Sequence, residues 1–279
     1  NLLLVMSRFG LSLGFGDQTV QQVCERQGVH TGTFLAVVNF MDGECCVSEE
    51  FHDQISVEAL MEYLKQAHSY FLDYNLPVIR RRLIDAIDCS QDDVAFLILK
   101  FYDEYVNEVR AHMGYENEVV FKYVNALLQG EDTGRYNIGV FVARHNQIET
   151  KLTELKNIIV KYYPSRANNN LLNTVLFDIY SCEKDLCSHC RVEDYMFVPL
   201  IAELEKKVQE NEVLKIAIAE TSMIVRSGLA LVLKRIQGLK ILPIELVSEE
   251  SLDECVRFHK PEILIVNPSF TGYFDVRKF

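Results

Sequence analysis

Residues 189–193 read HCRVE and residues 112–116 read HMGYE, so one histidine–glutamate spacing returns after 77 residues. Two single histidines, His68 and His145, are separated by the same 77 residues. The four histidines therefore form two equivalent halves, and in each half an H-x-x-x-E pair begins 44 residues after a lone histidine. This repeat predicts two similar helix pairs that share one site.

Four long segments with helical apolar spacing each contain one of these histidines. Start and stop signals mark their ends, because Ser56 with Glu58 fits a helix cap, and Gly130 and Pro164 follow the second and third segments. The expected segments cover 56–88, 91–129, 137–163 and 169–210. Apolar positions coincide in the two halves, namely Val109 with Leu186, Val119 with Met196, and Val124 with Ile201. Short connections make neighbouring helices antiparallel, so we expect an up-down four-helix bundle.

The H-x-x-x-E spacing has a chemical meaning on a helix. Residues i and i+4 lie on one face, so each pair can direct an imidazole nitrogen and a carboxylate to a single point. A lone buried histidine is more often a hydrogen-bonded core residue, but four positions with equal spacing favour metal ligands. Nitrogen and oxygen donors from facing helices are how bundles bind two iron or manganese ions. The predicted ligands are His68, His112, Glu116, His145, His189 and Glu193.

Four neutral imidazoles and two carboxylates carry a charge of about −2, so two divalent ions would need further anions such as oxo or hydroxo. We therefore predict two iron ions, with manganese or zinc as substitutes. Cys187 and Cys190 flank His189 and suggest zinc instead, but a zinc site of this type needs a second ligand cluster, which the sequence lacks. Cys182 is expected on the same helix stripe as His189, and Glu149 could accept a hydrogen bond from a histidine ligand.

Residues 51–211 resemble the hemerythrin-like, or HHE, family of non-haem di-iron bundles. The pattern is most similar to the repair-of-iron-centres type, whose metal set is likewise two lone histidines plus two H-x-x-x-E pairs. The resemblance implies that the four histidines are terminal ligands and that Glu116 and Glu193 can bridge the metals. Classical hemerythrins use a different, five-histidine set, so oxygen transport is not implied.

Residues 1–50 read as a small helical domain. Its expected helix caps are Asp17 for one helix and Thr31 or Thr33 for the next. This part resembles, more weakly, the small domain that precedes repair-type bundles, which carries a Cys-Cys pair after a turn. Here QGV is followed by HTGTF, and Cys45 and Cys46 lie later, in an acidic stretch that does not favour a reactive thiol.

Residues 212–279 show a different pattern. Three apolar runs, VLKIAIAE, LKILPIELV and PEILIVNP, alternate with two helical segments, the first capped by Thr221 or Ser222, which predicts a partial parallel α/β domain. Together these patterns predict a mainly α protein with a bundle, a small N-terminal helical domain and a C-terminal α/β part. Residues 213–270 resemble a response-regulator receiver domain. The positions of its metal-binding acidic pair hold Glu220 and Thr221, and the phosphoacceptor position holds Asn267, an amide and a poor nucleophile.

Composition limits the partners. The net charge of −12 and pI of about 5.1 disfavour contact with a nucleic acid, so any DNA contact would need a helix-turn-helix beyond residue 279. No apolar run reaches the roughly 20 residues of a membrane span, and the eight scattered cysteines suggest reduced thiols. We expect a cytoplasmic protein that binds O₂ or NO and forms a homodimer through the receiver-like part.

Two hypotheses about function follow. In the first, a di-iron centre senses O₂, NO or redox state and acts through a phosphorylation-dead receiver-like module, as part of a transcriptional regulator without enzymatic activity. In the second, the protein repairs iron–sulfur clusters by donating iron, or reduces NO at the di-iron centre. The fusion to a receiver-like part favours the first.

Overall fold

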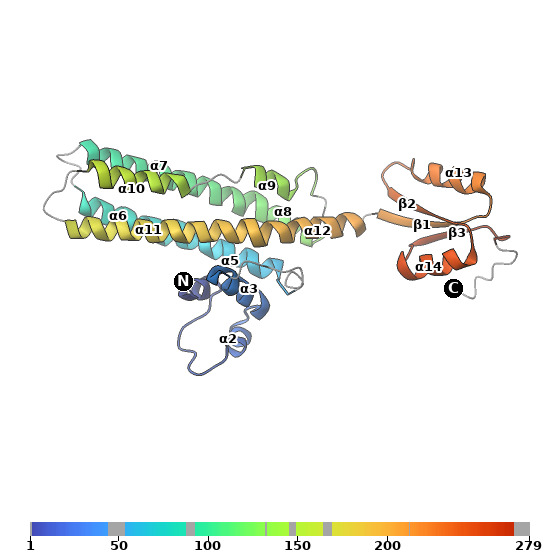
Figure 1. Cartoon of the computed structure of the whole chain (residues 1–279), viewed down its shortest axis with the longest axis horizontal. Coiled ribbons are helices and arrows are strands. Elements are labelled where there is room, and N and C mark those ends of the chain that lie inside the picture. Colours follow the sequence, from blue (N-terminus) through green and yellow to red (C-terminus); the bar gives the residue numbers. More distant parts are fainter. Residues whose placement is uncertain are drawn as a thin grey trace. The chain divides into compact units, whose positions relative to one another are not determined.

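The computed structural model describes residues 2–43, 54–87, 93–131, 133–144, 149–163, 169–211 and 213–270 (Figure 1). The chain divides into two compact units, Asn1–Leu204 and Glu205–Phe279. The first is helical, and the described part of the second combines parallel strands with helices. The predicted fold class, a helical bundle with a partial α/β part, is thus confirmed. The three predicted domains, 1–50, 51–211 and 212–279, remain a prediction.

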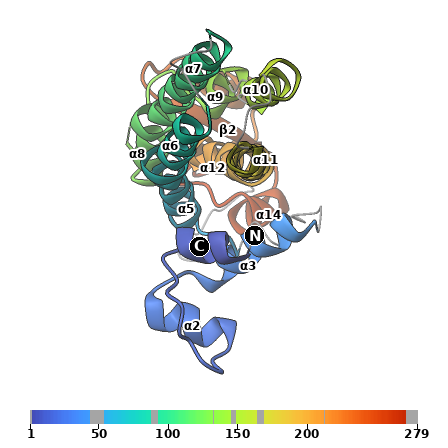
Figure 2. The ribbon, with the colours of Figure 1, turned by 90° about the vertical axis from the view of Figure 1, so that its left-hand side faces the viewer.

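Four long helical segments lie side by side in the first unit, as the end view of Figure 2 shows, and the fourth continues past Leu204 into the second unit. Their parts are α5 (Val57–Ser69), η1 (Tyr70–Asn75) and α6 (Leu76–Ala86); α7 (Asp93–Tyr115), η2 (Glu116–Val120) and α8 (Phe121–Leu128); α9 (Ile138–Arg144) and α10 (Glu149–Tyr162); and α11 (Asn169–Val192), η3 (Glu193–Phe197) and α12 (Val198–Asn211). These bounds fall within a few residues of the predicted segments, so the four-helix bundle is confirmed. Within the described residues, no helix has the length and apolar character needed to cross a membrane.

Local signals and core packing both account for these helices. The Ser56 hydroxyl accepts a hydrogen bond from the Ala59 N–H at 3.1 Å, which is the predicted cap of α5. Gly130 has a φ of +68° just after α8, a conformation that stops a helix at little cost to glycine. The bundle interior is apolar and aromatic, and the hydroxyl of the buried Tyr102 donates to the Leu76 carbonyl at 2.8 Å. Burial of one helix face therefore holds the segments together.

Among the described residues, π-helical stretches occur in three of the four segments. Pro77 lies just after η1 and has no N–H, so the carbonyl of Asp73 loses its usual α-helical partner and the helix widens there. The other two stretches begin at Glu116 and Glu193, the two glutamates of the repeated motif. Because π-helical turns within α-helices are frequent at functional sites, their position here points to the same part of the bundle.

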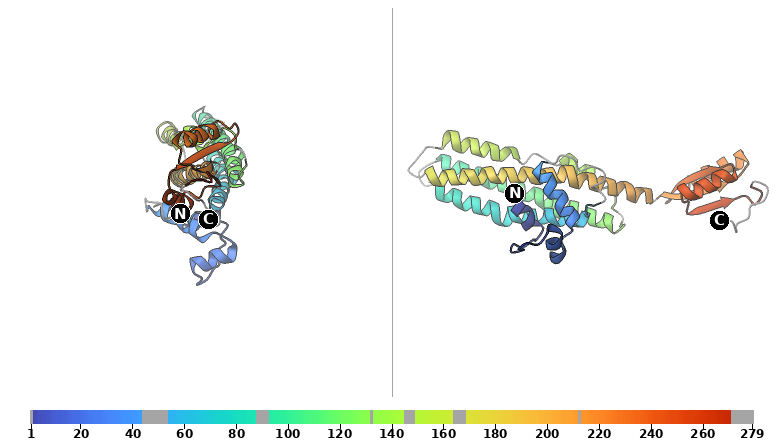
Figure 3. Two further views of the ribbon diagram at one scale, coloured as in Figure 1. Left: turned by 90° about the vertical axis from the view of Figure 1, so that its right-hand side faces the viewer. Right: turned by 60° about the horizontal axis from the view of Figure 1, so that its bottom comes forward.

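The described residues of the N-terminal part include the helices α1 (Leu2–Arg8), α2 (Val20–Gln27) and α3 (Thr31–Asp42), of which α1 contacts α5 and α3 contacts α11 (Figure 3). The predicted caps here were wrong. Thr19 caps α2 instead of Asp17, because the side chains of Thr19 and Gln22 bind each other's backbone N–H groups. His30 caps α3 instead of Thr31 or Thr33, because its Nδ1 accepts from the Thr33 N–H at 3.2 Å.

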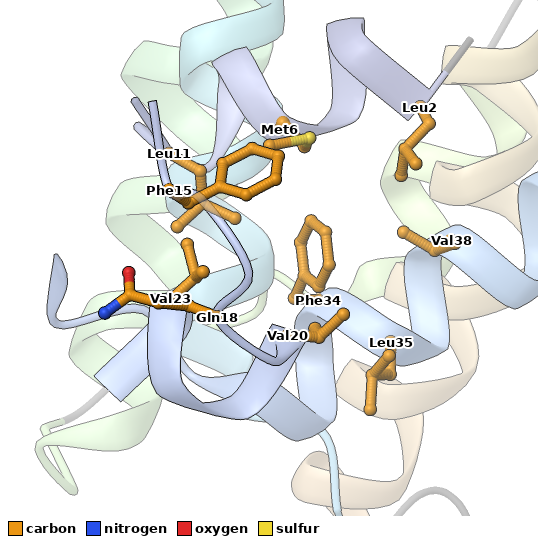
Figure 4. Close-up of a pocket in the computed structure, with 10 residues that line it drawn as sticks. All are labelled: Leu2, Met6, Leu11, Phe15, Gln18, Val20, Val23, Phe34, Leu35 and Val38. Carbon is orange, nitrogen blue, oxygen red and sulfur yellow. The ribbon is translucent and has the colours of Figure 1, made fainter. Parts of the chain in front are cut away.

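An apolar cavity of about 260 Å³ lies among these three helices (Figure 4). Met6 of α1, Phe15 of the following loop and Phe34 of α3 point toward one another across it. Gln18 is the one polar side chain among the described residues that line it. The N-terminal helices therefore leave a largely apolar cavity between them.

The second unit contains β1 (Val213–Ala219), α13 (Met223–Leu233), β2 (Lys240–Leu246), α14 (Glu249–Phe258) and β3 (Ile263–Val266). The strands are parallel in the order β2-β1-β3, with Ala217 beside Ile244 on one side and Leu264 on the other. Figure 1 shows α13 and α14 on opposite faces of this sheet, as right-handed crossovers in opposite directions require. Ser222, one of the two predicted caps, occupies the N-cap position of α13, but its side chain makes no capping hydrogen bond. The predicted parallel sheet is confirmed.

Candidate metal centre

Four of the predicted ligands meet in the bundle interior. They are His68 of α5, Glu116 at the start of η2, His189 of α11 and Glu193 at the start of η3, and all four are buried. One donor atom from each lies within 4.8 Å of the donor atoms of the other three. Three helical segments therefore direct two imidazoles and two carboxylates to one point, as the i, i+4 spacing predicts.

The separations of these donor atoms suit a shared cation. His68 Nε2 lies 3.2 Å from His189 Nε2 and 3.2 Å from Glu116 Oε2, and His189 Nε2 lies 3.1 Å from Glu193 Oε1. Ligands that bind one metal at right angles, with bonds of about 2.1 Å, are about 3 Å apart. The side chains thus already have the spacing of neighbouring ligands.

The hydrogen bonding of the cluster also fits a cation. Both carboxylate oxygens of Glu116 are buried, and neither has a hydrogen-bond partner among the described residues. Glu116 Oε2 lies 3.2 Å from His68 Nε2, at the distance of an ion pair. A buried carboxylate without a hydrogen-bond partner is costly, so a bound cation would satisfy Glu116. The residues present therefore fit the metal that the repeat implies.

His68 is the group most affected by these surroundings. Burial lowers the pKa of His68, but the carboxylates of Glu116 and Glu193 near its Nε2 outweigh burial and raise the pKa to about 9. The His68 side chain is 1% exposed, so its Nε2 is closed off from solvent. A proton on Nε2 would occupy the position that a metal ion would otherwise take. We therefore expect metal and proton to compete for this nitrogen.

Aromatic rings enclose the cluster. The Phe121 ring stacks on His68 with centroids 5.7 Å apart, and the rings of Phe71 and His189 form a T-shaped pair with centroids 5.9 Å apart. Both phenylalanines are buried. Apolar rings at these positions exclude water and strengthen electrostatic interactions inside the site.

His112 lies at the margin of this cluster. Its Nε2 is 2.9 Å from Glu116 Oε1, and its side chain is 15% exposed. The structure therefore brings His112 next to a predicted ligand of its own H-x-x-x-E pair. His145 lies outside the described residues, as do Cys45 and Cys46, and the side chain of Glu149 is not described.

The cysteines around the second motif do not join the cluster of four. Cys182 is 1% exposed, so its predicted place on a buried stripe is confirmed. Burial is the main cause that raises the pKa of the Cys182 thiol. A buried, protonated thiol is a packing group and not a reactive one.

The sequence did not single out two contacts that support the site. Asn117 Oδ1 lies 3.0 Å from His68 Nδ1, on the opposite edge of the ring from the cluster. Arg8 of α1 makes two hydrogen bonds to Asp185 of α11, at 3.0 and 2.6 Å, one turn before His189. Asn117 could have been suspected because it follows Glu116, whereas nothing local connects residues 8 and 185.

In the second unit, the polar residues that follow β1 and β3 meet. Asn267 Nδ2 donates to Glu220 Oε2 at 2.7 Å, and the Ser222 N–H donates to Glu220 Oε1 at 2.8 Å. The N–H of Ser222 and then the amide of Asn267 lower the pKa of Glu220. Arg226 donates to the Glu220 carbonyl at 2.7 Å. These bonds hold Glu220 as a carboxylate paired with an amide.

One comparison with known proteins gives a match. The family described as hemerythrin HHE cation binding domain matches residues 59–201, which is more than half of the chain. This span includes all six predicted ligands. No curated protein and no solved structure matches the chain.

Proposed function

Because the chain belongs to the hemerythrin HHE cation-binding family, we propose that its bundle holds two iron ions and senses O₂, NO or redox state. The observation that supports this is the convergence of four buried donors, two histidines and two glutamates, within 4.8 Å. The proposed ligand set is that of the repair-of-iron-centres type: His68, His112, Glu116, His145, His189 and Glu193. Iron supplies the change of oxidation state and an open position for a diatomic ligand.

The protein side chains have separate parts in this proposal. Glu116 and Glu193 bring the negative charge that selects cations, and the imidazoles bring neutral donors. Phe71 and Phe121 keep water from the ligand nitrogens. His112, with its partly exposed side chain beside Glu116, is on the side where a small ligand can approach.

A route for a signal follows from the chain itself. Glu193 begins η3, which continues directly into α12, the helix that leads to the second unit. A ligand or oxidation state that favours one position of Glu193 over another would therefore act on the start of this helix. We propose that the second unit is a receiver-like interaction module of a cytoplasmic transcriptional regulator, and that the protein forms a homodimer through this unit.

The test of the metal centre is metal content. The full chain, loaded with ferrous iron without oxygen and then desalted, should retain two iron equivalents. His112→Ala and His189→Ala should lose iron, and His259→Ala, an exposed histidine of the second unit, should retain it. Retention of two equivalents by both the His112 and His189 variants would remove the proposed centre.

The sensing role has its own measurement. Amide hydrogen exchange of α12 and of the second unit should differ between the ferrous protein and the protein exposed to NO or O₂. No difference in either segment, together with transfer of iron to apo iron–sulfur proteins, would favour the repair function instead.

The receiver-like module gives a further prediction. Asn267→Asp should lower the free energy of unfolding of the second unit by roughly 1–3 kcal/mol, because a carboxylate would replace the amide that donates to Glu220. Faster amide exchange in β1 and β3 of the full chain would report this loss. Asn267→Ala, which removes the donor without adding charge, should have the smaller effect, and equal exchange in all three proteins would contradict the argument.

A further inference from the structure

Asn117 and Glu116 are consecutive residues that approach the same imidazole from opposite edges. Glu116 Oε2 lies 3.2 Å from His68 Nε2, and Asn117 Oδ1 lies 3.0 Å from His68 Nδ1. Both residues belong to η2, the π-helical stretch of the second segment. His68 is thus held between a carboxylate on its cluster side and an amide oxygen on its outer side.

The amide oxygen decides which ring nitrogen carries the proton in the neutral imidazole. An oxygen of this kind only accepts hydrogen bonds, so it favours a proton on Nδ1. Nε2 then has a free lone pair that faces His189 Nε2 and the two carboxylates. The opposite tautomer would place a hydrogen atom where the cation has to bind.

The surroundings make this contact important. A pocket of about 320 Å³ lies at the outer edge of His68 and is lined by Lys65, His68, Ser69, Leu72, Asp73 and Asn117. Without the amide, water in this pocket would meet Nδ1. Because water both donates and accepts hydrogen bonds, it would not fix the tautomer.

We propose that Asn117 is the positioning residue of the metal centre, which holds His68 with Nδ1 protonated and Nε2 directed at the metal. The inference rests on the proposed metal-binding function and names a residue that acts through His68. The second half of the repeat has Asp194 at the corresponding place, directly after Glu193. The first half therefore has an amide at this position and the second half has a carboxylate. Asn117→Asp gives the first half the residue type of the second.

Two substitutions separate the role of the acceptor from that of packing. Asn117→Leu has a similar size and no acceptor, and should weaken Zn²⁺ binding roughly ten- to a hundredfold, as the loss of such a hydrogen bond to a ligand histidine does elsewhere. Asn117→Asp keeps an acceptor and should bind within about threefold of the original protein. Ser69→Ala is the matched control, because Ser69 lines the same pocket and its hydroxyl donates to Asp73 at 2.7 Å.

The experiment uses the full chain, Zn²⁺ competition with a chelator, and nitrogen NMR of ¹⁵N-histidine-labelled, Zn²⁺-saturated protein. In the original protein and in Asn117→Asp, the His68 Nδ1–H signal should be protected from exchange with water. In Asn117→Leu it should exchange fast, with weaker binding. Equal affinity and equal protection in Asn117→Leu would overturn the role of Asn117 while leaving the metal centre intact. If the original protein does not bind Zn²⁺, the metal centre itself fails.

Discussion

Without metal, the folded protein is expected to become less stable as the pH rises from about 6.5 to about 9. His68 has its ordinary pKa of 6.5 in the unfolded chain and a pKa of about 9 in the folded chain. The folded protein binds this proton more tightly than the unfolded chain, so protonation of His68 stabilises the folded state. This contribution is fully present below pH 6.5 and is lost as the pH rises past 9. The whole loss from this group amounts to at most about 3 kcal/mol.

Bound metal should oppose this loss of stability at high pH. A cation needs the unprotonated Nε2 of His68, so its affinity should increase over the same pH range. With excess Zn²⁺, the free energy of unfolding should therefore fall less between pH 6.5 and 9, or rise. Proton and metal thus stabilise the same cluster at opposite ends of one pH range.

Urea unfolding at several pH values, with EDTA or with excess Zn²⁺, measures both effects. The control is the double variant Glu116→Gln/Glu193→Gln, which removes the two carboxylates that raise the pKa of His68. In EDTA its stability should depend much less on pH in this range, and it should gain little from Zn²⁺. A flat profile for the original metal-free protein would contradict the assigned contacts around His68.

The repeat explains why so much of the bundle could be predicted from the sequence. Helix periodicity is a local signal, and an offset of 77 residues relates the two H-x-x-x-E pairs without knowledge of contacts. These signals were enough to identify the four segments and to single out His68, Glu116, His189 and Glu193, which the structure then brings together. The metal-ligand role of all six predicted residues remains a proposal.

Other features have no such local signal. The π-helical stretch η2 has no proline to cause it and depends on how a helix adapts to its neighbours, so Glu116 marked the motif but not the change of helix type. The cap of α2 at Thr19 depended on a reciprocal pair with Gln22 that competed with an equally plausible Asp17. The residue that corresponds to Asn117 in the other half of the repeat is Asp194. Because the residue type differs, the repeat could not identify Asn117.

The contact between Arg8 and Asp185 shows the same limit most clearly, since 177 residues separate them. Arg8 is 3% exposed, lies over the rings of Tyr70 and Phe71, and pairs with a carboxylate that is 5% exposed. Arg8 ends α1, so this pair ties the N-terminal helices to the bundle next to His189. Its loss should therefore affect the whole first unit.

Arg8→Met is expected to lower the free energy of unfolding by about 3–5 kcal/mol, because methionine keeps much of the packing but leaves the Asp185 charge buried and unpaired. The double variant Arg8→Met/Asp185→Leu removes both charges and should recover most of that loss. Arg82→Met provides the matched control, since Arg82 pairs with Asp178 at 2.5 Å but is 52% exposed and should cost at most about 1 kcal/mol. Urea unfolding in EDTA of the original protein and of these three variants gives the differences. A loss of less than 1 kcal/mol for Arg8→Met would mean that α1 does not dock on the bundle through this buried pair.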